Sequence, residues 1–322
     1  MKSRNVGLVV AALMVAVSGC KKSDEGQRLP VTPITPAGSD AGAAPGAAAD
    51  PWAKGEAKQD PLKHPLFWSI EKDGKTSYAL GTMHMGVDPQ TRIPQIVWQK
   101  LDQAKTFAME TDLAQSDKLD IRLEGNRTLK DELGDEYWKK LVAAVGESDA
   151  NRFLHLKPMI PATVLSMRGL PQTAPMDGVL LGRALNQKKQ IVYLEAIEKE
   201  AAVLEKWMTA RALKDMIDDI GEGEKHSKEM LDAYVAGDEA KIVELSDQER
   251  GEFKKHGRTD KEYDEQMDDL LYKRNASWIE PIEKLHADGG GFIAVGAMHL
   301  VGKRSVLDLL RQKGYQITRI TP

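Results

Sequence analysis

The sequence lacks several features that would place it in a common protein class. Cysteine occurs once in 322 residues, at Cys20, so intrachain disulfides and metal sites built from several cysteines are excluded. No Gly-x-Ser-x-Gly or P-loop motif is present, which leaves a serine hydrolase or a nucleotide-binding protein without a supporting motif. The 45 Lys and Arg do not outnumber the 49 Asp and Glu, and the net charge is −4. Nucleic acid is therefore not an expected partner.

The N-terminal segment has the order of an export signal. Lys2 and Arg4 precede a short apolar run over residues 6–17, which is too short to span a bilayer as a mature helix. Val17-Ser18-Gly19-Cys20 follows and resembles the bacterial lipobox. The resemblance implies cleavage before Cys20 and acyl chains such as palmitate on the new terminus. The alternative is an ordinary signal peptide with a chance cysteine.

We therefore predict three segments. Residues 1–19 form a lipoprotein signal peptide, residues 20–61 a disordered tether, and residues 62–322 one large folded domain. The tether is rich in Pro, Ala and Gly and has almost no large apolar residue to offset its ordering entropy. Acylated Cys20 would anchor an extracytoplasmic domain in the bacterial cell envelope. Lys21 and Lys22, where some bacteria carry a retention Asp, favour the outer membrane.

The folded part alternates β-prone and helical patterns. Short β-prone runs occur at residues 77–80, 106–109, 190–194, 292–295 and 315–320. Helical spacing occurs at residues 93–104, 129–145, 179–186, 198–220, 227–245, 262–286 and 305–312. Strands joined through helices predict an α/β fold with a partly parallel sheet and a largely helical insertion in the middle.

Two segments of the sequence resemble each other. Residues 79–85 read Ala-Leu-Gly-Thr-Met-His-Met, and residues 294–300 read Ala-Val-Gly-Ala-Met-His-Leu. Each follows a β-prone run, with a Gly where we expect the strand to stop and a His three residues later. Gly81 and Gly296 would let the backbone turn sharply or take positive φ, which projects His84 and His299 over the carboxyl end of the strand.

Glu110 and Glu195 also directly follow β-prone runs. If these strands are parallel neighbours, two imidazoles and two carboxylates meet at one edge of the sheet. Such donors suit Zn²⁺, Mn²⁺, Fe²⁺ or Co²⁺, with an open position for an activated water and a fourth residue as general base. Taken singly, each group has a plainer explanation: a carbonyl-capped loop histidine, or a negative charge at a helix N terminus.

A longer series of motifs resembles one known family. The series is Gly81 to Gly86, Met109-Glu110, Asp177 before a helix, Leu194-Glu195, Arg274-Asn275 and Gly296 to Gly302. Together these motifs resemble the TraB/GumN family, within the Tiki/TraB/GumN superfamily. The resemblance implies a Tiki-like α/β core and a metal-dependent hydrolase, a peptidase of extracytoplasmic peptides or proteins. It implies a divalent ion (Mn, Co or Zn) held by His84, His299 and Glu110.

The remaining family positions have less defined roles. Glu195 and Asn275 occupy motif positions, and Arg274 is assigned to anchoring a substrate carboxylate or a transition-state charge, which its forked guanidinium suits. The chain departs from many members after Glu195, where residues 196–200 read Ala-Ile-Glu-Lys-Glu instead of containing a Thr and a later Gln. A non-catalytic, peptide-sequestering lipoprotein is the alternative function. We expect solvated or structural roles for His64, His155, His226, His256 and His286.

Overall fold

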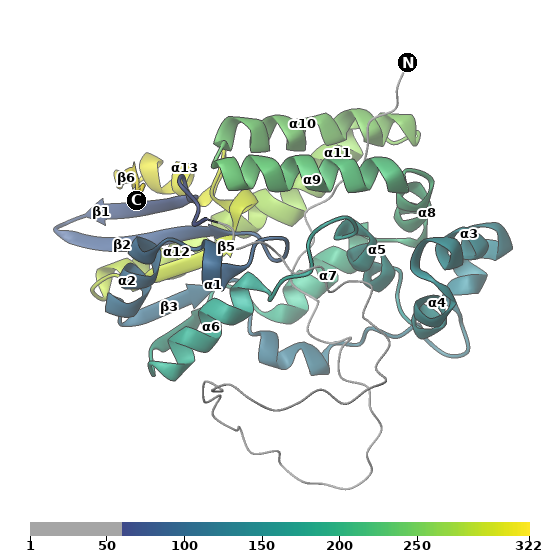
Figure 1. The fold of residues 1–322 in the computed structure, drawn as a ribbon, viewed down its shortest axis with the longest axis horizontal. Coiled ribbons are helices and arrows are strands. Elements are labelled where there is room, and N and C mark those ends of the chain that lie inside the picture. Colours follow the sequence, from purple (N-terminus) through teal and green to yellow (C-terminus); the bar gives the residue numbers. More distant parts are fainter. Residues whose placement is uncertain (1–59) are drawn as a thin grey trace, which may run out of the picture.

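A computed structural model describes residues 60–322 of the chain. The predicted signal peptide, Cys20 and nearly all of the predicted tether lie outside these residues. The six strands form one sheet in the order β4-β3-β5-β2-β1-β6, at the opposite end of the molecule from helices α3, α4 and α8 (Figure 1). Their bounds are β1 (Phe67–Lys72), β2 (Lys75–Thr82), β3 (Thr106–Met109), β4 (Gln190–Tyr193), β5 (Phe292–Gly296) and β6 (Gln316–Arg319).

The sheet is partly parallel, as predicted. β5 pairs in parallel with β2 on one side and β3 on the other, and β3 pairs in parallel with β4. β1 is antiparallel to both β2 and β6. β5 comes late in the sequence yet lies between the two earliest parallel strands, so the strand order switches there. Ligands of open α/β sheets bind at the carboxyl side of such switch points.

Helices connect the strands and form a second body beside the sheet, and α9 and α10 pack against each other (Figure 1). The α-helices are α1 (Pro89–Arg92), α2 (Gln95–Gln103), α3 (Leu129–Val145), α4 (Glu147–Phe153), α5 (Met159–Ser166), α6 (Met176–Asn186), α7 (Ile197–Trp207), α8 (Ala210–Asp218), α9 (Ile220–Ala236), α10 (Glu239–Lys255), α11 (Asp260–Met267), α12 (Lys273–Ala287) and α13 (Val306–Gln312). Short 3₁₀ turns η2 (Leu113–Lys118) and η4 (Ala297–His299) and a π-helical turn η3 (Asp268–Tyr272) complete the elements. None of the helices within residues 60–322 has the length and apolar character needed to cross a membrane.

Several element boundaries differ from the sequence prediction. The expected helix over 227–245 is interrupted because Gly237 adopts the left-handed conformation and ends α9, and the Asp238 side chain caps the start of α10. The expected helix over 198–220 is split where Thr209 caps α8. β1 was not predicted at all. Its hairpin turn is readable, since Asp73-Gly74 takes positive φ at both positions, as a type I′ turn requires.

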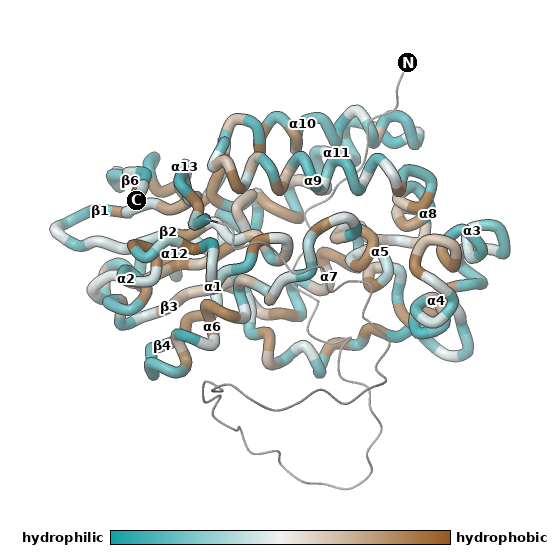
Figure 2. Tube along the Cα trace, viewed as in Figure 1, coloured by the Kyte–Doolittle hydropathy of each residue, from teal (hydrophilic) through white to brown (hydrophobic). Residues whose placement is uncertain are grey.

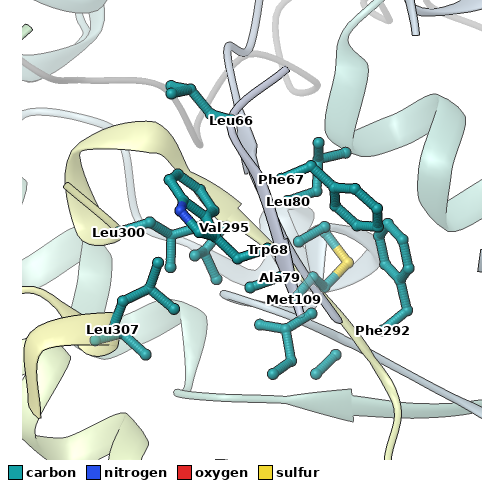
Figure 3. Packing of buried hydrophobic residues seen from close by; sticks show 14 of the residues in the cluster. Leu66, Phe67, Trp68, Ala79, Leu80, Met109, Phe292, Val295, Leu300 and Leu307 are labelled. Carbon is teal, nitrogen blue, oxygen red and sulfur yellow. The ribbon is translucent and has the colours of Figure 1, made fainter. Parts of the chain in front are cut away.

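The core has two parts. Around the sheet, all five residues of β5 are buried, as expected for a central parallel strand covered on both faces. The rings of Phe67 and Phe292 stack there with centroids 5.8 Å apart (Figure 3). A second apolar cluster lies among the helices, and partly buried Met298 packs against both clusters. In Figure 2 β3 and α5 are largely hydrophobic, whereas the tip of the β1–β2 hairpin and much of α3 are hydrophilic.

The turn before β5 provides a test of the fold. Gly290 has a φ of +86°, and a Cβ there would lie 2.1 Å from the Thr76 carbonyl oxygen; neighbouring Gly289 has a φ of +118° and open space. We expect Gly289→Ala to cost about 1–3 kcal/mol through backbone strain alone. Gly290→Ala should cost ~2 kcal/mol more because it also overlaps the backbone. Urea unfolding of the two variants measures the difference, and equal losses would contradict the placement of this turn.

Candidate site at the carboxyl ends of four parallel strands

Four parallel strands place one candidate side chain each at the same edge of the sheet. The strand order β4-β3-β5-β2 sets Glu195, Glu110, His299 and His84 in a row. The ladder continues beyond the strands, since the Glu195 N–H donates to the Glu110 carbonyl at 3.0 Å. The condition set by the sequence, that these strands be parallel neighbours, is therefore met.

Gly81 and Gly296 allow neighbouring atoms to approach the backbone closely, and they do not form the sharp turn that the sequence suggested. Neither has positive φ, because each continues its strand. A Cβ at Gly81 would lie 3.1 Å from the Ala297 Cα. A Cβ at Gly296 would lie 3.3 Å from Glu110 Oε1 and 3.6 Å from both His84 Nε2 and His299 Cδ2. Glycine at 296 thus leaves space where three candidate side chains meet.

His84 is oriented by a carboxylate on α6. Its Nδ1 donates to Asp177 Oδ2 at 2.5 Å, and the Thr82 hydroxyl donates to Asp177 Oδ1 at 2.8 Å. α6 begins at Met176, so Asp177 lies in its first turn and not before the helix. The Met176 N–H donates to the His84 carbonyl at 3.2 Å, which brings the helix N terminus against the loop. With Nδ1 committed, Nε2 is the atom that His84 presents.

His299 has a neutral partner in the same role. Its Nδ1 donates to Asn275 Oδ1 at 2.7 Å, and Asn275 Nδ2 donates to the Arg304 carbonyl at 3.0 Å, which fixes the orientation of the amide. Trp278 covers the ring, with centroids 4.5 Å apart. His299 therefore also presents Nε2, from the 3₁₀ turn that follows β5.

The two histidines of the twin segments are electrostatically opposite. Burial works against charge on His84, but Asp177 outweighs it, helped by Glu110 and Glu200, and raises the pKa of His84 to about 9. Burial lowers the pKa of His299 to about 3, with Arg274 and His84 adding to the effect against Glu110. His84 is 22% exposed at its side chain and His299 2%. At neutral pH, His84 is charged, whereas His299 is neutral and has a lone pair on Nε2.

Glu110 is held ionised between the two histidines. The Gly296 N–H donates to Oε1 at 2.7 Å and Arg274 Nη2 donates to Oε2 at 2.8 Å. Burial raises the pKa of this carboxyl, but His299, Arg274, His84 and the Gly296 N–H outweigh it and lower the pKa to about 2. His299 Nε2 lies 3.8 Å from Glu110 Oε2. Glu110 is therefore a carboxylate at neutral pH.

Arg274 is the hub of a buried cluster of carboxylates. Nε donates to Glu195 Oε1 at 2.6 Å, and Nη2 donates to Glu110 and, at 3.2 Å, to Glu200 Oε1. Nη1 donates to the Leu270 carbonyl at 3.2 Å, in the π-helical turn that directly precedes α12. Such turns are often found at functional sites. Arg274 is 5% exposed, and the expectation that it anchors a substrate carboxylate stays a prediction.

Glu200 is a site residue that the sequence did not single out. It lies in the first turn of α7 and accepts from Arg274 and, at 3.1 Å, from the Thr111 hydroxyl. Burial raises its pKa to about 7; Glu110 and Glu195 add to this, while Arg274 and Thr111 oppose it. The sequence signal that could have identified Glu200 is the departure from the family pattern after Glu195. Residues 196–200 read Ala-Ile-Glu-Lys-Glu, and the last of these glutamates is the one that joins the cluster.

The donor set fits a divalent transition-metal ion in kind. His84 and His299 each have Nδ1 bonded to an acceptor, the arrangement that orients metal-ligating imidazoles. They share the space beside Gly296 with the carboxylate of Glu110. The placement is incomplete, however: within residues 60–322 no three His, Cys, Asp or Glu side chains are arranged so that they could hold an ion. Arg274 Nη1 instead lies 3.5 Å from His299 Nε2.

The other described histidines lie apart from this cluster. His286 Nδ1 is 2.9 Å from the Ser77 hydroxyl, His256 Nε2 is 2.6 Å from Asp219 Oδ2, and His226 Nε2 is 3.4 Å from Glu249 Oε1. His64 and His155 are exposed. None of them contributes to the strand-end site.

The fold and the site define a class, an α/β protein with paired histidines and carboxylates at the carboxyl edge of its parallel strands. A sequence model of the TraB/PrgY/gumN family matches residues 66–319. The chain therefore belongs to the TraB/PrgY/gumN family, which confirms the prediction from the motifs.

Comparisons with individual proteins give the same assignment. The chain is similar to "Uncharacterized protein YbaP" of Shigella flexneri, 22% identical over 249 residues that span 73% of this chain and 88% of the relative. The Escherichia coli (strain K12) YbaP is 21% identical over 248 residues, 73% of this chain and 87% of that relative. A segment of 57 residues, 17% of this chain, is 39% identical to 11% of "Metalloprotease TIKI2" of Danio rerio. No solved structure matches the chain.

The Glu200 carboxyl gives a pH-dependent stability that can be measured. Its folded-state pKa of about 7 lies above the ordinary 4.5, so its contribution to stability is present below pH 4.5 and is lost as pH rises through 7. Glu200→Gln should therefore gain on the order of 2 kcal/mol over wild type at pH 8 relative to pH 5. Urea unfolding in chelator tests this, with Glu198→Gln, an exposed neighbour on α7, as the unchanged control. A pH-independent difference contradicts the burial of a protonated Glu200.

Proposed function

We propose that the protein is a metal-dependent hydrolase of peptide bonds. Family membership and the short similarity to a protein named as a metalloprotease support hydrolysis. The observation that carries the proposal is the space beside Gly296, which Glu110 Oε1 and the rings of His84 and His299 border within 3.3–3.6 Å of a Cβ position. His84, His299 and Glu110 would hold a divalent ion such as Mn²⁺, Co²⁺ or Zn²⁺ there. When bound, such an ion supplies a Lewis acid for attack on an amide carbonyl.

The chain's own residues prepare the site in definite ways. Asp177 and Asn275 hold the two imidazoles so that Nε2 of each is presented. The Gly296 N–H fixes one oxygen of Glu110, and the depressed pKa keeps that residue ionised and able to bind a cation. Buried neighbours strengthen these electrostatic interactions because little water screens them. The arrangement supports a preorganised site for charge that develops on a substrate.

We further propose that the protein acts in the bacterial cell envelope, anchored by lipid on Cys20. The N-terminal charges, the short apolar run and the single cysteine in a lipobox-like sequence support this. Peptides or proteins near the membrane would then be the substrates. Replacing Cys20 by Ala should move the protein from the membrane to the soluble fraction of the envelope, and retention at the membrane contradicts the anchor.

Metal content is the direct test of the ion site. Protein purified without chelator should contain a divalent ion by elemental analysis, and His84→Ala and His299→Ala should lose it. Asp177→Asn should bind the ion about 10- to 100-fold more weakly because a neutral amide replaces the charged carboxylate that accepts from Nδ1 of His84. His155→Ala, at an exposed histidine, is the matched control. A metal-free wild type, or two alanine variants that are loaded as fully as wild type, contradicts the proposal.

A non-catalytic peptide-binding protein is the second candidate. The lack of a three-ligand arrangement within the described residues favours it, as does the altered segment after Glu195. Incubating a peptide library with the protein and Mn²⁺, Co²⁺ or Zn²⁺, followed by mass spectrometry, separates the two. Metal-dependent cleavage that is lost in His84→Ala supports the hydrolase, with activity falling as pH drops because protons compete with the ion for the imidazole nitrogens. Peptides that bind and are recovered intact support sequestration.

A further inference from the structure

Arg274 contacts two of the three side chains proposed to hold the ion. Its Nη2 donates to Glu110 Oε2 at 2.8 Å, and its Nη1 lies 3.5 Å from His299 Nε2. Glu110 Oε2 and His299 Nε2 are themselves 3.8 Å apart. A guanidinium therefore lies against the donor atoms that a divalent ion would use.

The surroundings of Arg274 contain more carboxylates than one guanidinium can neutralise. Three carboxyl groups accept from it, those of Glu110, Glu195 and Glu200. Among the described residues, Glu195 Oε2 is buried without a hydrogen-bond partner, and Lys199 Nζ lies 3.7 Å from it. Burial opposes charge on Arg274, but the three carboxylates outweigh it and raise its pKa above the usual range. The cluster thus contains one permanent cation, the Arg274 guanidinium, and excess negative charge that attracts a second cation.

Arg274 also has partners that do not depend on Glu110. Nε is bonded to Glu195, and the Leu270 carbonyl and Glu200 accept from the two terminal nitrogens. If the contact with Glu110 is broken, the guanidinium keeps hydrogen bonds on all three nitrogens. Releasing Glu110 therefore removes one of the two acceptors of Nη2 and leaves Glu200 as the other. The usual large cost of breaking a buried pair, a charged group left with no partner at all, does not arise for Arg274.

We propose that Arg274 and the divalent ion are alternative partners of Glu110 and His299, so that ion binding displaces the guanidinium from Glu110 Oε2 toward Glu195 and Glu200. The inference rests on the proposed ion site. In the ion-free protein, Arg274 neutralises Glu110 and keeps the buried carboxylates together. Its contact with Glu110 must be given up for the ion, so Arg274 lowers ion affinity while it stabilises the ion-free fold. If Arg274 instead only held Glu110 in the orientation needed to bind the ion, it would raise the ion affinity.

A Co²⁺ titration of the purified protein distinguishes these roles. Binding is followed by calorimetry and by the visible absorption of bound Co²⁺, neither of which depends on catalysis. Arg274→Gln should bind Co²⁺ at least about tenfold more tightly than wild type, and the rise in Tm on adding Co²⁺ should be larger. Arg274→Lys keeps the charge but not the fork, so it should also bind more tightly, by a smaller factor. Arg250→Gln, whose guanidinium pairs with Asp264 on the surface, is the control and should match wild type.

Each outcome separates the inference from the proposed function. Wild type that binds Co²⁺ while both Arg274 variants bind equally or more weakly overturns the inference and leaves the ion site standing. Wild type that binds no Co²⁺ contradicts the ion site itself. Since the glutamine variant leaves three buried carboxylates without their cation, it is checked by circular dichroism in chelator. If it does not fold, ¹⁵N-arginine spectra of wild type decide, with diamagnetic Zn²⁺ in place of Co²⁺ because paramagnetic Co²⁺ would shift nearby signals in any case. The Arg274 signals, identified by their loss in Arg274→Lys, should shift on adding Zn²⁺, and unshifted signals overturn the inference.

Discussion

Parallel pairing of β5 between β2 and β3 is the constraint on which the site depends. β5 is buried at every position and pairs on both sides, so its register fixes the strands that flank it. Thr82, and not Gly81, pairs with Gly296. The two similar segments, residues 79–85 and 294–300, are therefore shifted by one residue relative to each other in the sheet. Their histidines therefore enter different surroundings, one beside Asp177 and the other beside Asn275. Similar sequence motifs thus give one charged and one neutral imidazole at neutral pH.

The two parts of the core contribute different groups to the site. The sheet provides His84, Glu110 and His299 at its strand ends, whereas α12 provides Arg274 and Asn275. The π-helical turn before α12 places the Leu270 carbonyl where it accepts a hydrogen bond from Arg274, four residues later in the chain. Because Met298 packs against both apolar clusters, the site lies where the sheet and the helical body meet. A shift between these two bodies would change the distance from Arg274 to Glu110.

The local sequence was sufficient to predict the side chains at the strand ends, but not the residues that hydrogen-bond to them. The β-prone runs before Glu110, Glu195, His84 and His299 are short-range patterns, so the row of side chains was predictable once parallel neighbours were assumed. Strand order was not predictable, because β5 pairs with strands far back in the chain: Phe292 lies opposite Tyr78 on one side and Phe107 on the other. The choice of Asp177 and Asn275 as imidazole partners depends on how α6 and α12 pack. The Asp73-Gly74 hairpin, by contrast, was readable and was missed.

Excess buried carboxylate decides which cations the site tolerates. Three glutamates surround one guanidinium, and burial makes each unneutralised charge costly. The protein reduces the cost in two ways visible in the structure, by raising the pKa of Glu200 to about 7 so that it takes up a proton, and by pairing His84 with Asp177. A divalent ion would be a third way, since it adds positive charge where Glu110 and His299 already face each other. The same carboxylates that make the ion-free cluster unfavourable therefore favour an ion over water at this edge of the sheet.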